Sequence, residues 1–142
     1  MKILAIDYGD ARIGLAISDD NKILALPLAT IKAGKTIDLS VDNVIDYITP
    51  RLSEIEAVVV GLPLHMNGKE SPMSTKAREF AKNLEEKLSI KVDLLDERLS
   101  SAYITSSLKE INMNRKKRSK IIDSAAASAI LQNYMERLKN LS

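Results

Sequence analysis

The stretch MKILAIDYGDARIG, residues 1–14, decides the fold. Its apolar run Ile3-Leu4-Ala5-Ile6 predicts a strand over residues 2–7 that is buried on both faces. This strand delivers one carboxylate, Asp7, to its end, where the chain turns. A second strand, expected over Arg12 to Ser18, follows closely enough to be its hairpin partner. The beginning of the chain therefore predicts a sheet whose first strand carries an acid at its carboxyl end.

The spacing of apolar residues predicts the remaining elements outward from this hairpin. First, we expect a strand over residues 22–31, which Pro27 places at a sheet edge, and a helix from about Ser40 that Pro50 ends or bends. A buried strand over residues 57–61, a long loop over residues 62–72 and a helix capped by Ser74 or Thr75 follow. The chain then continues with a strand over residues 91–96, a short helix from Ser100 or Ser101 to about Leu108, and a last helix over residues 120–139. This order predicts an α/β fold with a five-stranded mixed sheet, in which a three-strand antiparallel meander and two parallel strands are flanked by helices.

Composition is that of an ordinary globular protein. The chain has 142 residues, of which 45% are hydrophobic and 28% charged, so we expect a single domain over residues 1–142. The first apolar run is too short for a signal peptide or a membrane span, and a cytoplasmic location is expected. The net charge is only +2, but Asn114 to Lys120 read NRKKRSK, with five positive charges in seven residues. Such a local cluster can attract a phosphate backbone.

Three acidic positions are expected to form a metal site. Asp7 ends the first strand, the pair Asp96-Glu97 ends the last strand, and Asp123 lies near the start of the final helix. Each acid alone also fits a structural role, because turns and helix starts favour Asp. Two carboxylates about 4 Å apart repel by roughly 4 kcal/mol at an effective dielectric near 20, so a cluster of three needs a cation.

The chemistry of the available side chains favours a hard cation at this site. The chain contains no cysteine and one histidine, so an all-oxygen site suits Mg²⁺ or Mn²⁺ better than zinc. Such metals activate water and stabilise the leaving oxygen in phosphodiester cleavage. Asp7, Glu97 and Asp123 are the expected catalytic residues and metal ligands, and Asp96 is the alternative to Glu97, because neighbours on a strand point to opposite faces.

At this point the sequence resembles a known family, the bacterial pre-16S ribosomal RNA nucleases, also called YqgF or Holliday-junction-resolvase-like proteins. The resemblance runs nearly end to end and rests on Asp7-Tyr8-Gly9 with Arg12-Ile13-Gly14-Leu15-Ala16, Gly61-Leu62-Pro63 with Asn67-Gly68, Asp96-Glu97-Arg98-Leu99-Ser100-Ser101, and Asp123-Ser124-Ala125-Ala126-Ala127 with Ile130-Leu131-Gln132. It implies a ribonuclease H-like fold and a Mg²⁺-dependent nuclease that trims the 5′ end of the small-subunit ribosomal RNA precursor. The family's acidic residues fall onto Asp7, the Asp96-Glu97 pair and Asp123. Ser100-Ser101 stand where the family usually has threonines.

Several polar and basic side chains are candidates for contact with the substrate. Arg98 could bind a phosphate or form an ion pair with Asp96, and the only histidine, His65, is more readily a loop residue than a general base. The basic run could be a solvated face, but its place between two acidic elements favours phosphate contact. The predicted substrate-binding residues are Tyr8, as a base-stacking ring, with Arg12, Asn67, Lys69, Arg98, Arg115, Lys116, Lys117 and Arg118.

The sequence is compatible with four functions. The first is a metal-dependent nuclease acting on structured ribosomal RNA precursor, as a monomer or weak homodimer that contacts no membrane. The second is a nuclease for branched DNA, which would favour a stable dimer because four-way junctions are two-fold symmetric. The third is an ATPase-like phosphate hairpin at Gly9 and Gly14, although such proteins need a second domain. The fourth is a non-catalytic RNA-binding assembly factor.

Overall fold

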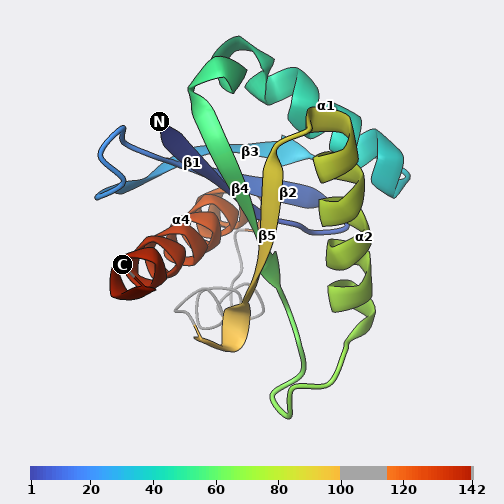
Figure 1. Ribbon diagram of the computed structural model, residues 1–142. Helices are drawn as coiled ribbons and strands as arrows, with labels where there is room; N and C mark the ends of the chain where they lie inside the picture. The colour runs from blue at the N-terminus through green and yellow to red at the C-terminus, as the bar shows by residue number, and fades with distance from the viewer. Residues whose placement is uncertain (100–114, 142) are drawn as a thin grey trace.

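The structure, a computed structural model, describes the backbone of residues 1–99 and 115–141 and the side chains of residues 1–98 and 124–140. Its elements in chain order (Figure 1) are β1 (Lys2–Asp7), β2 (Arg12–Ser18), β3 (Ala25–Lys32), α1 (Ile37–Ile48), the 3-10 turn η1 (Thr49–Glu54), β4 (Ile55–Leu62), α2 (Pro72–Leu88), β5 (Lys91–Asp96), the 3-10 turn η2 (Glu97–Leu99) and α4 (Arg115–Leu141). The predicted short helix over residues 100–108 lies outside the described residues.

The five strands form one mixed sheet in the order β3-β2-β1-β4-β5. β1, β2 and β3 are an antiparallel meander, while β4 pairs parallel to β1 and β5 pairs parallel to β4. The predicted fold class is therefore confirmed, as is the edge position of β3, the strand that carries Pro27. The two strands that carry the acids Asp7 and Asp96 are not adjacent, however, because β4 lies between them.

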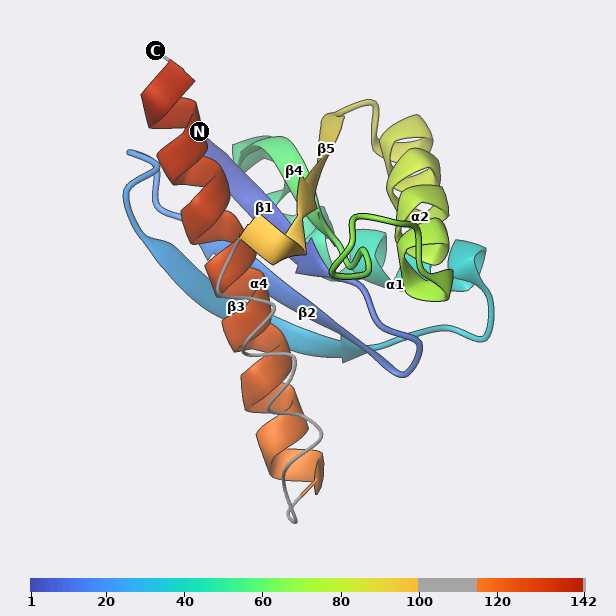
Figure 2. The same ribbon diagram turned by 90° about the horizontal axis from the view of Figure 1, so that it is seen from below.

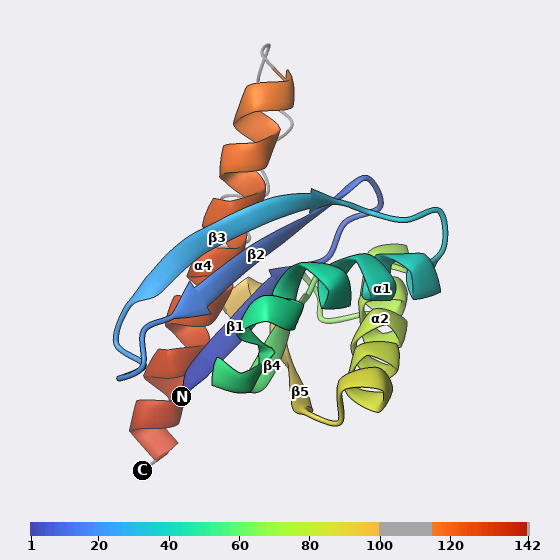
Figure 3. The ribbon, with the colours of Figure 1, turned by 90° about the horizontal axis from the view of Figure 1, so that it is seen from above.

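Helices cover both faces of the sheet. Figures 2 and 3 show α1 and α2 together on one side and α4 alone on the other. The alternation of β1 explains the two resulting cores, since successive strand residues point to opposite faces. Leu4 and Ile6 pack in the core beneath α1 and α2, whereas Ile3 and Ala5 pack beneath α4. A strand with apolar residues at every position is thus buried on both faces, as its sequence indicates.

Capping residues place the helix starts earlier than apolar spacing predicts. α1 begins at Ile37, and the hydroxyl of Thr36 accepts a hydrogen bond of 3.1 Å from the Leu39 amide. α2 begins at Pro72 with Ser71 as its N-cap, so the prediction of Ser74 or Thr75 is wrong. Ser74 is instead the reciprocal partner in a capping box, in which each serine hydroxyl accepts from the other's amide.

The last helix also begins before its predicted start. α4 runs from Arg115 rather than Lys120, so Arg115, Lys116, Lys117 and Arg118 lie in its first turns and not in a segment before it. Their side chains lie outside the described residues. Within the described part of the chain, none of these helices is long and apolar enough to cross a membrane.

Helix packing makes a first prediction about stability. Leu84 of α2 is fully buried, whereas Leu39 of α1 is 47% exposed. We expect Leu84→Ala to lower the free energy of unfolding by about 2–5 kcal/mol, through lost burial and a residual cavity. Leu39→Ala, the control, should change it by less than about 0.5 kcal/mol. Urea unfolding followed by circular dichroism measures both, and equal effects would contradict this packing.

Tyr134 makes a second prediction, about alkaline pH. Its ring is buried beneath the sheet and its hydroxyl donates a hydrogen bond to the Asp93 carboxylate on β5. Burial, reinforced by that hydrogen bond, raises the pKa of Tyr134 far above its ordinary value near 10. A raised folded-state pKa stabilises the fold below the unfolded-state pKa, and this contribution is lost as pH rises above about 10.

The measurement compares wild type with Tyr134→Phe. We expect the stability advantage of the wild type over Tyr134→Phe to shrink between about pH 9 and pH 12, as the unfolded-state phenol ionises. Tyr47→Phe removes a hydroxyl from an exposed ring of α1 and controls for removal of a hydroxyl. A difference between wild type and Tyr134→Phe that stays constant over this range would refute the prediction.

Candidate active site

Asp7 lies at the carboxyl end of β1, at the middle of the sheet. It pairs with Gly14 of β2, and only 8% of its surface is exposed. Alternation along β1 places it on the same face as Ile3 and Ala5, which is the face that α4 covers. The sequence therefore delivers this carboxylate into a buried position on the face that α4 covers.

Gly61 of β4 lies between the two acidic strand ends and forms the floor of the candidate site. Ile6 of β1 pairs with Val60, so the next position of β4 lies beside Asp7, and Gly61 itself pairs with Leu95 of β5. A Cβ at Gly61 would overlap Glu97 Oε1 and would lie 2.6 Å from Ile130 Cδ1 of α4. The carboxylate of Glu97 thus lies directly over the bare backbone of the strand that separates β1 from β5.

Glu97 and Asp7 therefore share one face of the sheet. Glu97 directly follows β5, is only 5% exposed, and reaches back over β4 towards β1. Strand separation of about 4.8 Å would otherwise leave the ends of β1 and β5 about 10 Å apart. Because Gly61 has no side chain and the glutamate side chain is long, the Glu97 carboxylate lies closer to β1 than the end of β5 does.

Asp96 faces the other side of the sheet. It pairs with Leu62, which packs in the core beneath α2, and Arg98 grips it with Nη2 2.6 Å from Oδ2 and Nε 3.1 Å from both carboxylate oxygens. Hydrogen bonding to the Arg98 guanidinium holds the pKa of Asp96 below its usual range. Of the two alternatives for the second acid, Glu97 is the one on the face of Asp7.

Asp123, the third predicted acid, lies within α4, and its side chain is outside the described residues. Ala126, Ala127 and Ile130 of the same helix are fully buried against the sheet, and Ile130 contacts the floor at Gly61. Small residues on this face allow α4 to approach the sheet closely. The helix that contains Asp123 thus covers the face on which Asp7 and Glu97 lie.

The donors on this face fit a hard divalent cation. Among the side chains that the structure describes, no group of three or more His, Cys, Asp or Glu residues gathers to hold a metal ion. Two buried carboxylates are nevertheless the usual protein contribution to Mg²⁺, which keeps several waters and takes further oxygens from substrate phosphates. Asp7 and Glu97 supply oxygen atoms of this kind, whereas zinc would favour nitrogen and sulfur donors.

The loop between β4 and α2 lies beside the end of β5, where Gly68 packs on Arg98. Its tip is a tight turn in which the Gly68 amide donates to the His65 carbonyl at 2.8 Å and the His65 amide donates to the Lys69 carbonyl at 2.9 Å. The predicted substrate contact Asn67 instead uses its carbonyl oxygen within the turn, accepting a bond of 3.0 Å from the Lys69 amide. The Lys69 side chain is exposed on this loop.

Tyr8 does not lie where a base could stack on it. Its ring is 8% exposed, and its centroid is 4.8 Å from that of Phe80, in the core beneath α1 and α2. The prediction that Tyr8 stacks on a nucleic-acid base is therefore wrong, because the residue after Asp7 points to the opposite face. Arg12 lies at the beginning of β2, opposite Lys32 of β3.

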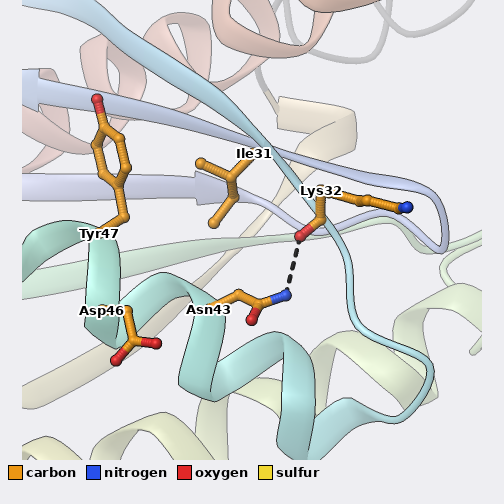
Figure 4. Close-up of a pocket in the computed structure, with 5 residues that line it drawn as sticks. All are labelled: Ile31, Lys32, Asn43, Asp46 and Tyr47. Atoms are coloured by element: carbon orange, nitrogen blue, oxygen red, sulfur yellow. Dashed lines mark hydrogen bonds between the residues drawn. The ribbon is translucent and has the colours of Figure 1, made fainter.

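A surface hollow of about 400 Å³ lies between β3 and α1 (Figure 4). Its lining residues are Ile31, Lys32, Asn43, Asp46 and Tyr47, and the Asn43 side-chain amide donates a 3.2 Å hydrogen bond to the Lys32 carbonyl. Among the side chains that the structure describes, none of the predicted catalytic or substrate-binding residues lines it. The candidate site is thus the crossing of Asp7, Gly61 and Glu97 under α4, and not this hollow.

Gly61 is absent from the predicted site residues, although a glycine after the run Ala57-Val58-Val59-Val60 signals a close approach by another group. We expect Gly61→Ala to lower the free energy of unfolding by about 1–3 kcal/mol, because the new methyl group overlaps Glu97 and Ile130. Adding Ile130→Val removes the Cδ1 atom and should recover part of this loss beyond additivity. A double-mutant cycle by urea unfolding measures the coupling, and strictly additive effects would contradict the contact.

Comparison with known proteins agrees with this architecture. Residues 1–137 match the family model RuvX, described as Holliday junction resolvase. A protein of Protochlamydia amoebophila named "Putative pre-16S rRNA nuclease" is 40% identical over 95% of this chain and 93% of its own length. A protein of Koribacter versatilis with the same name is 41% identical over 96% of this chain and 87% of its own length.

A solved structure of Thermus thermophilus RuvC in complex with a Holliday junction substrate has the same fold. It superposes with a TM-score of 0.57 at 13% sequence identity, over 98% of this chain and 96% of that one. The ribonuclease H-like architecture that the family resemblance implies is therefore confirmed. The end-to-end family match and the identity of 40% and more to curated relatives show that this chain belongs to the RuvX family.

Proposed function

We propose that this protein is a nuclease that hydrolyses phosphodiester bonds in a ribosomal RNA precursor, at a divalent-cation site formed by Asp7, Glu97 and Asp123. Nuclease activity follows from its membership of the RuvX family and from the names of its curated relatives. The single observation that carries the site is the buried Glu97 carboxylate, which crosses over Gly61 on the face that holds Asp7. We further propose that the protein is cytoplasmic, consists of one domain, and acts as a monomer or weak homodimer.

Each part of the chain has a role in this proposal. Mg²⁺ or Mn²⁺ at the site would supply activation of water and charge neutralisation at the phosphate. Asp7 is held by the strand ladder, Glu97 is held over the glycine floor, and α4 excludes bulk water from that face. Such burial strengthens the electrostatic attraction between the carboxylates and a cation.

Basic and polar residues near the acids would hold the nucleic acid. The run from Arg115 to Arg118 forms the first turns of α4, the helix that also contains Asp123. Lys69 is on the loop that follows β4, the strand of Gly61. Phosphate contacts from both segments would place the backbone across the acidic face, because lysine and arginine supply most of the affinity for nucleic acids.

The test is cleavage under Mn²⁺ and Mg²⁺ by wild type and by carboxylate-to-amide variants. We expect Asp7→Asn, Glu97→Gln and Asp123→Asn each to reduce the cleavage rate of a pre-16S ribosomal RNA substrate by more than about 100-fold, since even indirect support of a metal ligand is worth 10–100-fold. Asp10→Asn is the matched control, because Asp10 follows the same strand but lies in an exposed ion pair with Lys76.

Two outcomes would overturn the proposal in different ways. Full activity of Asp7→Asn with an intact fold would exclude the proposed site. Cleavage of a four-way DNA junction in preference to the RNA, by a stable dimer, would favour the second candidate, which the description of the family model supports. A protein that binds the RNA but takes up no Mn²⁺ would instead be an assembly factor without catalysis.

A further inference from the structure

Arg98 makes more contacts than a surface ion pair requires. Its guanidinium grips both oxygens of Asp96, and its Nη1 donates a 3.2 Å hydrogen bond to the Met66 carbonyl in the loop after β4. We infer that Arg98 is a positioning residue, which holds Glu97 over Gly61 and fastens the loop of residues 63–71 to the end of β5. As far as catalysis is concerned, this inference rests on the proposed function.

The bidentate contact between Arg98 and Asp96, which we call the fork, joins the two residues on either side of Glu97. Asp96 and Arg98 are its two neighbours, and besides the guanidinium contacts the Arg98 amide donates a 3.0 Å hydrogen bond to Asp96 Oδ1. This closed ring restrains the backbone on both sides of Glu97 at the point where β5 becomes η2. Because Asp96 and Glu97 point to opposite faces, a fork on one face sets the direction of the carboxylate on the other.

The same guanidinium determines where the loop lies. Gly68 has a φ of +85°, and a Cβ there would lie 3.2 Å from Arg98 Nη1, so the turn packs directly on the arginine. At its other end the loop is fastened to α2, where Arg78 grips Glu70 with Nε 2.6 Å from Oε1. Within the loop, Ser71 Oγ donates a 2.6 Å hydrogen bond to the Pro63 carbonyl. Arg98 attaches the loop to the end of β5, next to Glu97.

These contacts compete with the alternative role of Arg98 as a phosphate ligand. A bidentate grip on a phosphate uses the same planar fork that Asp96 now occupies. Nε, Nη1 and Nη2 each already donate to a protein oxygen, and the side chain is 29% exposed. Lys69, exposed on the fastened loop, is better available to a phosphate.

The decisive variants are Arg98→Lys and Asp96→Asn. Each keeps a polar side chain but removes the bidentate fork, since an ammonium cannot grip both oxygens and an amide is uncharged. We expect each to lower kcat on the RNA substrate and the affinity for Mn²⁺ by about 10–100-fold, with KM for RNA changed less than about threefold. The double variant should lose little more than either single one, because both remove the same contact.

Arg78→Lys is the matched control. It removes an equivalent arginine–carboxylate fork from the far side of the same loop, and it touches no residue next to Glu97. We expect its kcat and Mn²⁺ affinity to remain within about twofold of wild type. Comparable losses in Arg78→Lys and Arg98→Lys would mean that general loosening of the loop, and not the direction of Glu97, accounts for the effect, and would overturn the inference.

A second readout requires no catalysis. In the metal-free protein, the amides of His65, Gly68 and Lys69 are bonded within the turn that Arg98 holds. We expect hydrogen exchange at these amides to accelerate at least about tenfold in Arg98→Lys, while exchange in β1 and β4 stays unchanged. If wild type cleaved no nucleic acid, the proposed function would fail, and this exchange measurement would still decide whether Arg98 holds the loop.

A phosphate-binding Arg98 would give a different pattern. Arg98→Lys would then raise KM, leave kcat and amide exchange unchanged, and reduce the salt dependence of RNA binding by roughly one counterion. Asp96→Asn would release the guanidinium and strengthen RNA binding instead of weakening catalysis. Either result would overturn the positioning role.

Discussion

The carboxylate of Glu97 lies in the space that β4 leaves empty at Gly61, and the candidate site depends on this contact. β4 separates the strand that ends in Asp7 from the strand that ends in Asp96. Any side chain at Gly61 would meet Glu97 and the methyl terminus of Ile130. A glycine in a central strand weakens the strand locally, so its presence here is best explained by the close approach that it permits.

The two faces of the sheet differ in what they bury around this contact. On the face of α1 and α2, Tyr8, Phe80 and Leu84 fill an apolar core, and Asp96 is neutralised by Arg98 at the rim. On the face of α4, Ile3, Ala5 and Ile130 pack beneath a single helix. Asp7 and Glu97 are buried at the carboxyl ends of β1 and β5. Strand alternation places Asp96, which Arg98 grips, on one face and places Asp7 and Glu97 on the other.

The loop between β4 and α2 lies against Arg98 at the end of β5. It begins at the strand that contains Gly61, contacts Arg98, and ends in the capping box that starts α2. Its turn is held by its own backbone. Arg98 holds the Met66 carbonyl, and Arg78 holds Glu70 near the start of α2. A loop held in this way presents Lys69 and its neighbours at a fixed place near the end of β5, which is what a binding surface on a rigid scaffold requires.

Local physical chemistry made much of this protein predictable from its sequence. Apolar runs and their period predicted the succession of strands and helices along the chain and the mixed sheet, because burial on one or two faces leaves a direct pattern in the residues. Pro27 predicted the edge position of β3. The same alternation left open whether Asp96 or Glu97 faces Asp7, and misplaced Tyr8, because a sequence does not say which face is which. Only the tertiary structure decided these points. They depend on the position of β4 between β1 and β5 and on the missing side chain at Gly61. They also depend on the contact of Arg98 with Asp96, because Asp96 lies on one face and Glu97 on the face of Asp7.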